Sequence, residues 1–279
     1  MFISDCTRQA VEDLRMCRLF AFVAPHSSTV DTELGNSGLH CLISLAQVHG
    51  DGWGWAGVSE IGSQPTVHKS PLSAAADPEF HRTLATPARA AMVHLRWATL
   101  GLEIGDENTH PFLAEGISFE HNGSLKPIER IRALLSPESL TGMHGDTDSE
   151  MYFALIKEKT GAGLPLPAAT LATARELREA YPTGSLNAFT LDAEHLVVVH
   201  ANARTFLSDE DVMLLREFDL PDAHADDYYS LQWLTKSDGT VLIGSTGVAE
   251  AGWRAMPAES VITISLADGA VSIAQILTD

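Results

Sequence analysis

A cysteine with the potential to act as a nucleophile, Cys17, follows Met16 in the stretch MCRLFAF, in which an apolar run begins at Leu19. A small residue after methionine permits methionine removal during synthesis, which would leave Cys17 as the first residue. Its α-amino group, with a pKa near ~8, would then be partly neutral at pH 7 and able to take the thiol proton. An amide nitrogen inside a chain has no such capacity. The alternative is that Cys17 is a small buried residue at the start of a strand.

Residues 1–16 decide between these two interpretations. They carry Asp5, Glu12 and Asp13 and no apolar run long enough for a secretory signal. We expect Met16 to be the true start; a leader cleaved before Cys17, or one that is retained and blocks the amine, are the alternatives. The expected division is thus a leader or mis-assigned start at 1–16 and one domain over 17–279.

An arginine flanked by apolar residues, Arg96, lies in the stretch HLRWATLG. A buried guanidinium needs an anionic partner, so Arg96 is a candidate for holding a substrate carboxylate through two parallel hydrogen bonds. A partly exposed arginine paired with a neighbouring acid is equally compatible with the residue alone. His94 and Trp97 are expected to pack rather than to react.

The pair Asn122-Gly123 follows a strand-like run in FEHNGSL. Asn-Gly is first of all a turn signal. The functional interpretation is that the Asn122 amide and the Gly123 N–H point into one space and stabilise an oxyanion, where removing one donor costs about 3 kcal/mol.

A helix start is predicted in HGDTDSEMYFALI, because Thr147 and Glu150 form a capping-box pattern before an apolar run. Asp148 then lies in the first helical turn, where the helix dipole favours a carboxylate. It is either a helix-start acid only or the group that receives the ammonium of an amino-acid substrate.

Taken together and in this order, the Cys17 start, HLRWATLG, HNGSL and GDTDSE resemble the class II glutamine amidotransferase domain of the N-terminal nucleophile hydrolases. Two further stretches, HGDGWGWAG and ENTHPF, are similar to its short, free-standing branch, which includes the ergothioneine-pathway γ-glutamyl amidohydrolase. The resemblance implies a four-layer αββα sandwich of two antiparallel sheets between helical layers.

The resemblance also implies roles. Cys17 would attack the γ-carboxamide carbon, and Asn122 and Gly123 would form the oxyanion hole. The substrate-binding residues would be Arg96, Trp97, Thr99 and Asp148, with Arg96 on the α-carboxylate and Asp148 on the α-ammonium of a glutamyl group. Gly52, Trp53 and Gly54 would wall the pocket, although the glycines fit a plain strand distortion equally well. No metal or cofactor is implied.

Several functions stay open at this point. The protein is expected to hydrolyse glutamine or a γ-glutamyl amide, or else to be a glutaminase subunit that feeds ammonia to a separate synthase. An N-terminal cysteine acylase of the penicillin or bile-salt type should lack HNGSL and TDSE. A non-catalytic interaction protein on the same fold is a further alternative, and a histidine zinc site is remote because the spacing is unconvincing.

The composition of the chain excludes some classes of binding partner. With 18 Lys+Arg against 37 Asp+Glu, the formal charge of -19 repels phosphate backbones and anionic lipids, so we expect neither nucleic acid nor membrane. Three cysteines without a CxxC pair predict no disulfide framework and favour a reducing, cytoplasmic setting.

Short runs rich in β-branched and aromatic residues predict strands at 18–24, 52–58, 91–97, 117–121, 186–191, 195–200, 228–234, 240–245, 260–265 and 270–276. Helices are predicted at 38–49, after Pro78, at 127–135, after Thr147 and at 171–180. The stretch 161–169 is expected to be a loop, and 208–229 to contain an acidic connection. The predicted strands outnumber the helices and come in adjacent pairs. This pattern is typical of an α+β protein with antiparallel sheets and helices on the outer faces.

Overall fold

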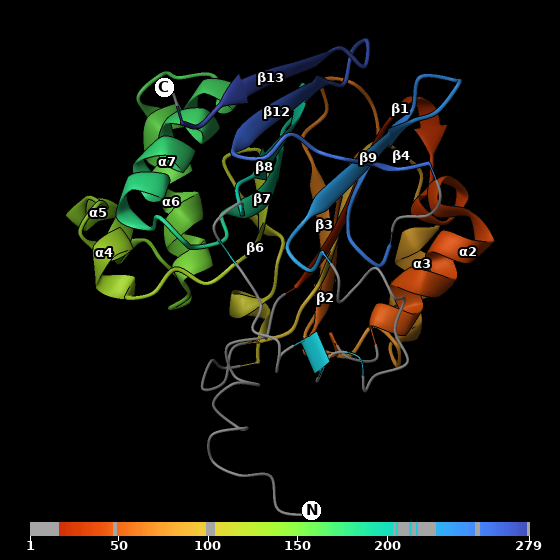
Figure 1. The fold of residues 1–279 in the computed structure, drawn as a ribbon, viewed down its shortest axis with the longest axis horizontal. Coiled ribbons are helices and arrows are strands. Elements are labelled where there is room, and N and C mark those ends of the chain that lie inside the picture. Colours follow the sequence, from red (N-terminus) through yellow and green to blue (C-terminus); the bar gives the residue numbers. More distant parts are fainter. Residues whose placement is uncertain are drawn as a thin grey trace, which may run out of the picture.

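The computed structural model describes residues 17–46, 49–98, 104–202, 205, 212–213, 216, 227–248 and 252–277. Over these residues, two antiparallel sheets stack face to face and helices cover both outer faces (Figure 1). The four-layer α+β architecture predicted above is therefore confirmed.

The first sheet has the strand order β11-β9-β10-β1-β4-β2-β3. Its members are β1 (Arg18–Ser28), β2 (Trp53–Val58), β3 (Thr66–Ser70), β4 (Ala88–Leu95), β9 (Leu231–Thr235), β10 (Val241–Ser245) and β11 (Arg254–Ala255). Phe20 of β1 lies opposite Gly244 on one side and Val93 on the other. The strand that follows Cys17 is thus in the middle of its sheet.

Helices α2 (Val30–Leu45) and α3 (Pro78–Leu84) cover the outer face of this sheet (Figure 1). The α2 helix starts earlier than the predicted 38–49, because the Thr29 side chain caps it by accepting from the Thr32 N–H. Gly35, at φ 66°, interrupts it, which is why its first part showed no continuous helical pattern.

The second sheet has the order β13-β12-β8-β7-β6-β5. Its members are β5 (Phe112–Ala114), β6 (Ile117–Asn122), β7 (Asn187–Leu191), β8 (His195–His200), β12 (Ser260–Ser265) and β13 (Val271–Gln275). Its outer face carries α4 (Ile128–Arg132), α5 (Pro137–Thr141), α6 (Asp148–Gly161) and α7 (Leu166–Ala180) (Figure 1). A 3₁₀ turn, η1 (Asp106–Asn108), precedes β5.

Part of the predicted loop at 161–169 is wrong, since α7 already begins at Leu166. Pro165 is the N-cap residue of α7 and Pro167 lies in its first turn, where a missing N–H costs no intrahelical bond. The short strands β3, β5 and β11 and the one-turn helix α5 were not predicted, and β9 begins three residues later than expected, at Leu231. Most of the stretch 208–229 lies outside the described residues.

Three apolar clusters hold the layers together: one under α2 and α3, one under α4 to α7, and one between the sheets. Leu19 and Met92 from the first sheet belong to the cluster between the sheets, as do Phe189 and Val198 from the second. No helix in the described part of the chain has the length and hydropathy needed to cross a membrane.

Candidate active site

Three residues lie side by side where the central strands of the first sheet end. Arg18 pairs with Leu95, and Leu95 pairs with Trp53. One residue further along each antiparallel strand, Cys17, Arg96 and Gly52 form the next row, and the Arg96 N–H donates to the Gly52 carbonyl at 2.9 Å. Because side chains alternate along a strand, this row faces the second sheet, as Leu19 does.

The Cys17 thiol is a weak acid in this setting. Burial raises its pKa to about 11, although a hydrogen bond with the Trp97 backbone and the charges of Arg96 and Arg18 lower it. The charge of Asp51 raises this pKa further. At neutral pH the sulfur therefore carries a proton, and nucleophilic attack needs a base at hand to remove it.

Arg96 is buried, with 4% of its surface exposed, and not the partly exposed surface arginine considered as an alternative. Burial lowers the pKa of its guanidinium, whereas the charges of Cys17 and Asp51 raise it. Asp51 also fixes the backbone here, donating its N–H to the Arg96 carbonyl at 3.0 Å and accepting from the Ala98 N–H at 2.9 Å. Sequence reasoning missed this acid, although it lies between two glycines in HGDGWGWAG.

Asn122 is the last residue of β6 and pairs with Asn187 of β7. It is 1% exposed, and the Ser185 hydroxyl donates to its carbonyl at 2.8 Å. A Cβ on Gly123 would lie 2.1 Å from the Ser185 carbonyl oxygen and 2.4 Å from Nε2 of His121, so only glycine fits. The pair is not a hairpin turn, because the chain runs on from β6 into α4.

The two sheets meet directly next to this pair. The His94 ring of β4 lies against the His121 backbone of β6, and its Nε2 lies 3.1 Å from Nδ1 of His110. Burial lowers the pKa of His94 to about 3 and that of His110 well below its usual range. Burial likewise lowers the pKa of His121, against the charge of Asp148. These rings are therefore neutral near pH 7 and serve as hydrogen-bonding and packing groups.

Asp148 borders the turn that follows Asn122. Thr147 caps α6 by accepting from the Glu150 N–H, which places Asp148 in the first turn as predicted. Its Oδ2 accepts from the Leu125 N–H, and its Oδ1 lies 3.4 Å from the Ser149 hydroxyl. The carboxylate is thus held two residues beyond Gly123.

The predicted pocket wall is only partly at the site. Gly52 is in the row described above, at φ 136°. A Cβ on Gly54 would lie 2.0 Å from the His110 carbonyl oxygen, so the absence of a side chain at Gly54 leaves room for the backbone of His110. Trp53 points to the opposite face, where its Nε1 donates to Asp77 at 3.0 Å, so it does not line this site.

Of the remaining predicted substrate-binding residues, Trp97 is half-buried next to the row and meets His49 edge to face, with ring centroids 5.2 Å apart. Thr99 lies outside the described residues. No group of three or more His, Cys, Asp or Glu side chains suited to a metal ion occurs within the described residues.

Comparison with known proteins identifies the family. Residues 16–275 match the family model for class II glutamine amidotransferases. Among curated proteins, the glutamine–fructose-6-phosphate aminotransferase of Shewanella oneidensis is 34% identical over 115 residues, covering 40% of this chain and 18% of the relative. The Escherichia coli K12 enzyme of the same name is 35% identical over 92 residues, covering 33% of this chain and 15% of the relative. The chain thus spans less than a fifth of the length of these relatives.

Solved structures share the fold at low sequence identity. A glutamine aminotransferase class-II domain protein from Silicibacter pomeroyi superposes with a TM-score of 0.60 at 18% identity, over 94% of this chain and all of that one. The glutamine phosphoribosylpyrophosphate amidotransferase of Bacillus subtilis gives 0.60 at 16% identity, over 94% of this chain and 50% of that one. Because the family model matches residues 16–275, most of the sequence, the chain belongs to the class II glutamine amidotransferases.

Proposed function

We propose that the protein hydrolyses the γ-carboxamide of glutamine or of a γ-glutamyl amide through a thioester on Cys17. Ammonia or an amine and glutamate are the products. Family membership supports glutamine amide hydrolysis in general. The finer proposal rests on one observation: Cys17 and Arg96 lie in one row at the end of the first sheet and face the second sheet, whose strand β6 ends at Asn122.

The base in this proposal is the α-amino group of Cys17, which exists only when no residue precedes it. The thiol proton moves to that amine and the sulfur attacks the γ-carbonyl carbon. A thiol with a pKa of about 11 requires such a base within reach. Collapse of the tetrahedral intermediate breaks the C–N bond, and the leaving amine takes the proton. Water, activated by the same amine, then releases glutamate.

The oxyanion of both steps is assigned to the Asn122 side-chain amide and the Gly123 N–H. Two backbone carbonyls beside them already have hydrogen-bond partners. The Asn122 carbonyl accepts from the Ser185 hydroxyl, and the Ser185 carbonyl is bonded to the His121 ring. This leaves a turn of fixed geometry, as electrostatic stabilisation of a transition state requires.

The two charges of the glutamyl group are assigned to two charged side chains, Arg96 in the row and Asp148 beside the Asn122-Gly123 turn. Arg96 would bind the α-carboxylate through its planar fork. Asp148 would bind the α-ammonium, with the Leu125 N–H fixing the orientation of its carboxylate.

The test begins with the intact mass of protein expressed from its native start region, followed by a diazo-ketone analogue of glutamine. We expect a chain that begins at Cys17 and carries a single label on that residue. The variant C17A should take no label, while C41A, which removes the half-buried cysteine of α2, should be labelled like the wild type.

A mass that retains residues 1–16 together with full glutamine hydrolysis would refute the role of the amine. Absence of label on a chain that begins at Cys17 would refute the nucleophile. Hydrolysis of γ-glutamyl amides in preference to glutamine would identify a hydrolase in its own right. Glutamine hydrolysis that rises only when a synthase is added would favour ammonia supply to a partner.

A further inference from the structure

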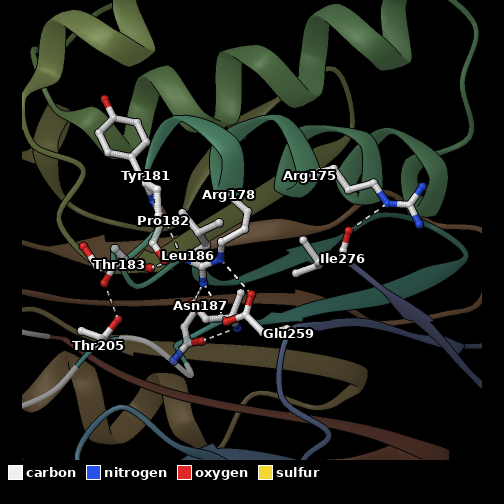
Figure 2. Close-up of polar contacts among 12 residues, drawn as sticks. Arg175, Arg178, Tyr181, Pro182, Thr183, Leu186, Asn187, Thr205, Glu259 and Ile276 are labelled. Atoms are coloured by element: carbon white, nitrogen blue, oxygen red, sulfur yellow. Dashed lines mark hydrogen bonds and ion pairs between the residues drawn. The ribbon is translucent and has the colours of Figure 1, made fainter. Parts of the chain in front are cut away.

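One buried arginine, Arg178, is hydrogen-bonded to the segment that connects α7 to β7 (Figure 2). Arg178, on the last turn of α7, is 2% exposed. Its Nε and Nη2 donate to the two carboxylate oxygens of Glu259 at 2.8 and 2.9 Å. Its Nη1 and Nη2 donate further to four backbone carbonyls, those of Tyr181, Pro182, Gly184 and Ala201.

The carbonyls that Arg178 binds belong mainly to residues 181–186, which connect α7 to β7. Leu186 closes this connection by donating its N–H to the Ala201 carbonyl at 2.9 Å, the same oxygen that Nη2 of Arg178 binds at 2.7 Å. Thr205 ties it from outside through the Thr183 carbonyl (Figure 2). The guanidinium thus holds this connection at three of its carbonyls, those of Tyr181, Pro182 and Gly184.

Ser185, inside this connection, contacts both halves of the Asn122-Gly123 turn. Its hydroxyl donates to the Asn122 carbonyl at 2.8 Å, and its own carbonyl lies 3.2 Å from Nε2 of His121. The same carbonyl oxygen occupies the space that a side chain on residue 123 would need. A displacement of Ser185 is therefore transmitted directly to the proposed oxyanion donors.

We propose that Arg178, with Glu259, is a positioning residue for the oxyanion hole: it fixes residues 181–186 so that Ser185 sets the backbone of Asn122 and Gly123. This inference rests on the proposed function above. Lysine cannot replace the arginine, because its three donors on one atom cannot span a carboxylate and carbonyls on two sides.

The same helix offers a matched control in Arg175. Its guanidinium also donates to backbone carbonyls, at Ile276 (3.2 Å) and Gln275 (2.9 Å), but it holds the end of β13 and not the connection to β7 (Figure 2). R178K and R175K thus remove the same kind of contact from one helix, at different distances from the site.

The experiment compares both variants with the wild type in steady-state glutamine hydrolysis and in inhibition by two ligands. Glutamate γ-semialdehyde adds to the thiol and places an oxyanion in the hole, whereas glutamate does not. For R178K we expect kcat to fall about 10- to 100-fold, as for a displacement near 1 Å, with KM little changed. Its Ki for the aldehyde should rise by a similar factor and its Ki for glutamate should stay unchanged. R175K should match the wild type in all four constants.

If the ratio of the two inhibition constants is the same in R178K and R175K, the positioning role is wrong. Should R178K fail to fold, E259Q replaces it, since this variant keeps the oxygen that accepts from one arm of the guanidinium and removes the charge. The same change in ratio, smaller in size, is expected there.

A readout without turnover separates this inference from the proposed function. Amide hydrogen exchange at Gly123 and Leu125, measured by NMR, should speed up at least tenfold in R178K or E259Q but not in R175K. Faster exchange in a protein that neither hydrolyses glutamine nor binds the aldehyde would refute the proposed function alone. Unchanged exchange in an active protein would refute the positioning role alone.

Discussion

Replacing Gly123 by alanine introduces a methyl group where there is no space. The new Cβ would lie 2.1 Å from the Ser185 carbonyl oxygen, whereas ordinary contact begins at 3.4 Å, so the turn must retreat by about 1.3 Å. Neither obstacle is a flexible chain end: one is backbone, and the other is the His121 ring, held by Ser149 at 2.9 Å. A misplacement near 1 Å costs about 100-fold in rate, or about 2.7 kcal/mol of transition-state stabilisation.

The measurement is kcat for glutamine hydrolysis by G123A, with the folded fraction checked by circular dichroism at the assay temperature. Overpacking should also destabilise the fold, by about 1 to 3 kcal/mol. The matched control is G142A at the end of α5, whose new Cβ meets the backbone oxygens of Glu138 at 3.6 Å and Ser139 at 3.8 Å, both ordinary contacts. A folded G123A protein with the kcat of the wild type would show that Gly123 does not shape the oxyanion hole.

Three further changes test the rest of the site. D148N keeps an oxygen for the Leu125 N–H but removes the charge proposed to bind the substrate ammonium, so kcat/KM for glutamine should fall about 10- to 100-fold, mainly through KM; an unchanged KM contradicts that role. R96K retains the positive charge but loses the planar guanidinium, so KM for glutamine should rise about tenfold. If KM stays at the wild-type value, Arg96 does not bind the substrate α-carboxylate. An unfolded histidine titrates near ~6.5 but folded His94 near about 3, so the unfolded state binds more protons in this window and stability falls as pH drops through it. Urea unfolding of H94Q between pH 6 and 4 should accordingly show a slope shallower by up to about 1.4 kcal/mol per pH unit, and an identical slope would mean that His94 titrates normally.

Much of the fold followed from local pattern. The strand at 117–121 and the helix after Thr147 were predicted within a residue or so, because alternation and a cap act over a few neighbouring positions. Family resemblance, rather than spacing, predicted that Cys17 and Arg96 belong to one site. Their juxtaposition comes from the register of β1 against β4, which no single segment encodes.

The errors have equally physical origins. Trp53 was grouped with its glycine neighbours although strand alternation puts it on the opposite face from Gly52 and Gly54, a signal present in the sequence. Ser185 and Arg178 had no such signal. Ser185 lies 63 residues from the Asn122 carbonyl it binds, and only the pairing of β6 with β7 brings the two together.

The position of β1 has a consequence for the order in which the chain becomes active. Its neighbour on one side, β10, is made more than two hundred residues later, as the pairing of Phe20 with Gly244 requires. Until that segment leaves the ribosome, β1 has one open edge and the first sheet lacks β9, β10 and β11. Pairings of such sequence separation form late in folding, since the intervening loop must close first. The proposed Cys17 site therefore requires that the chain has been made through β10, and removal of residues 231–245 would leave β1 with an exposed edge.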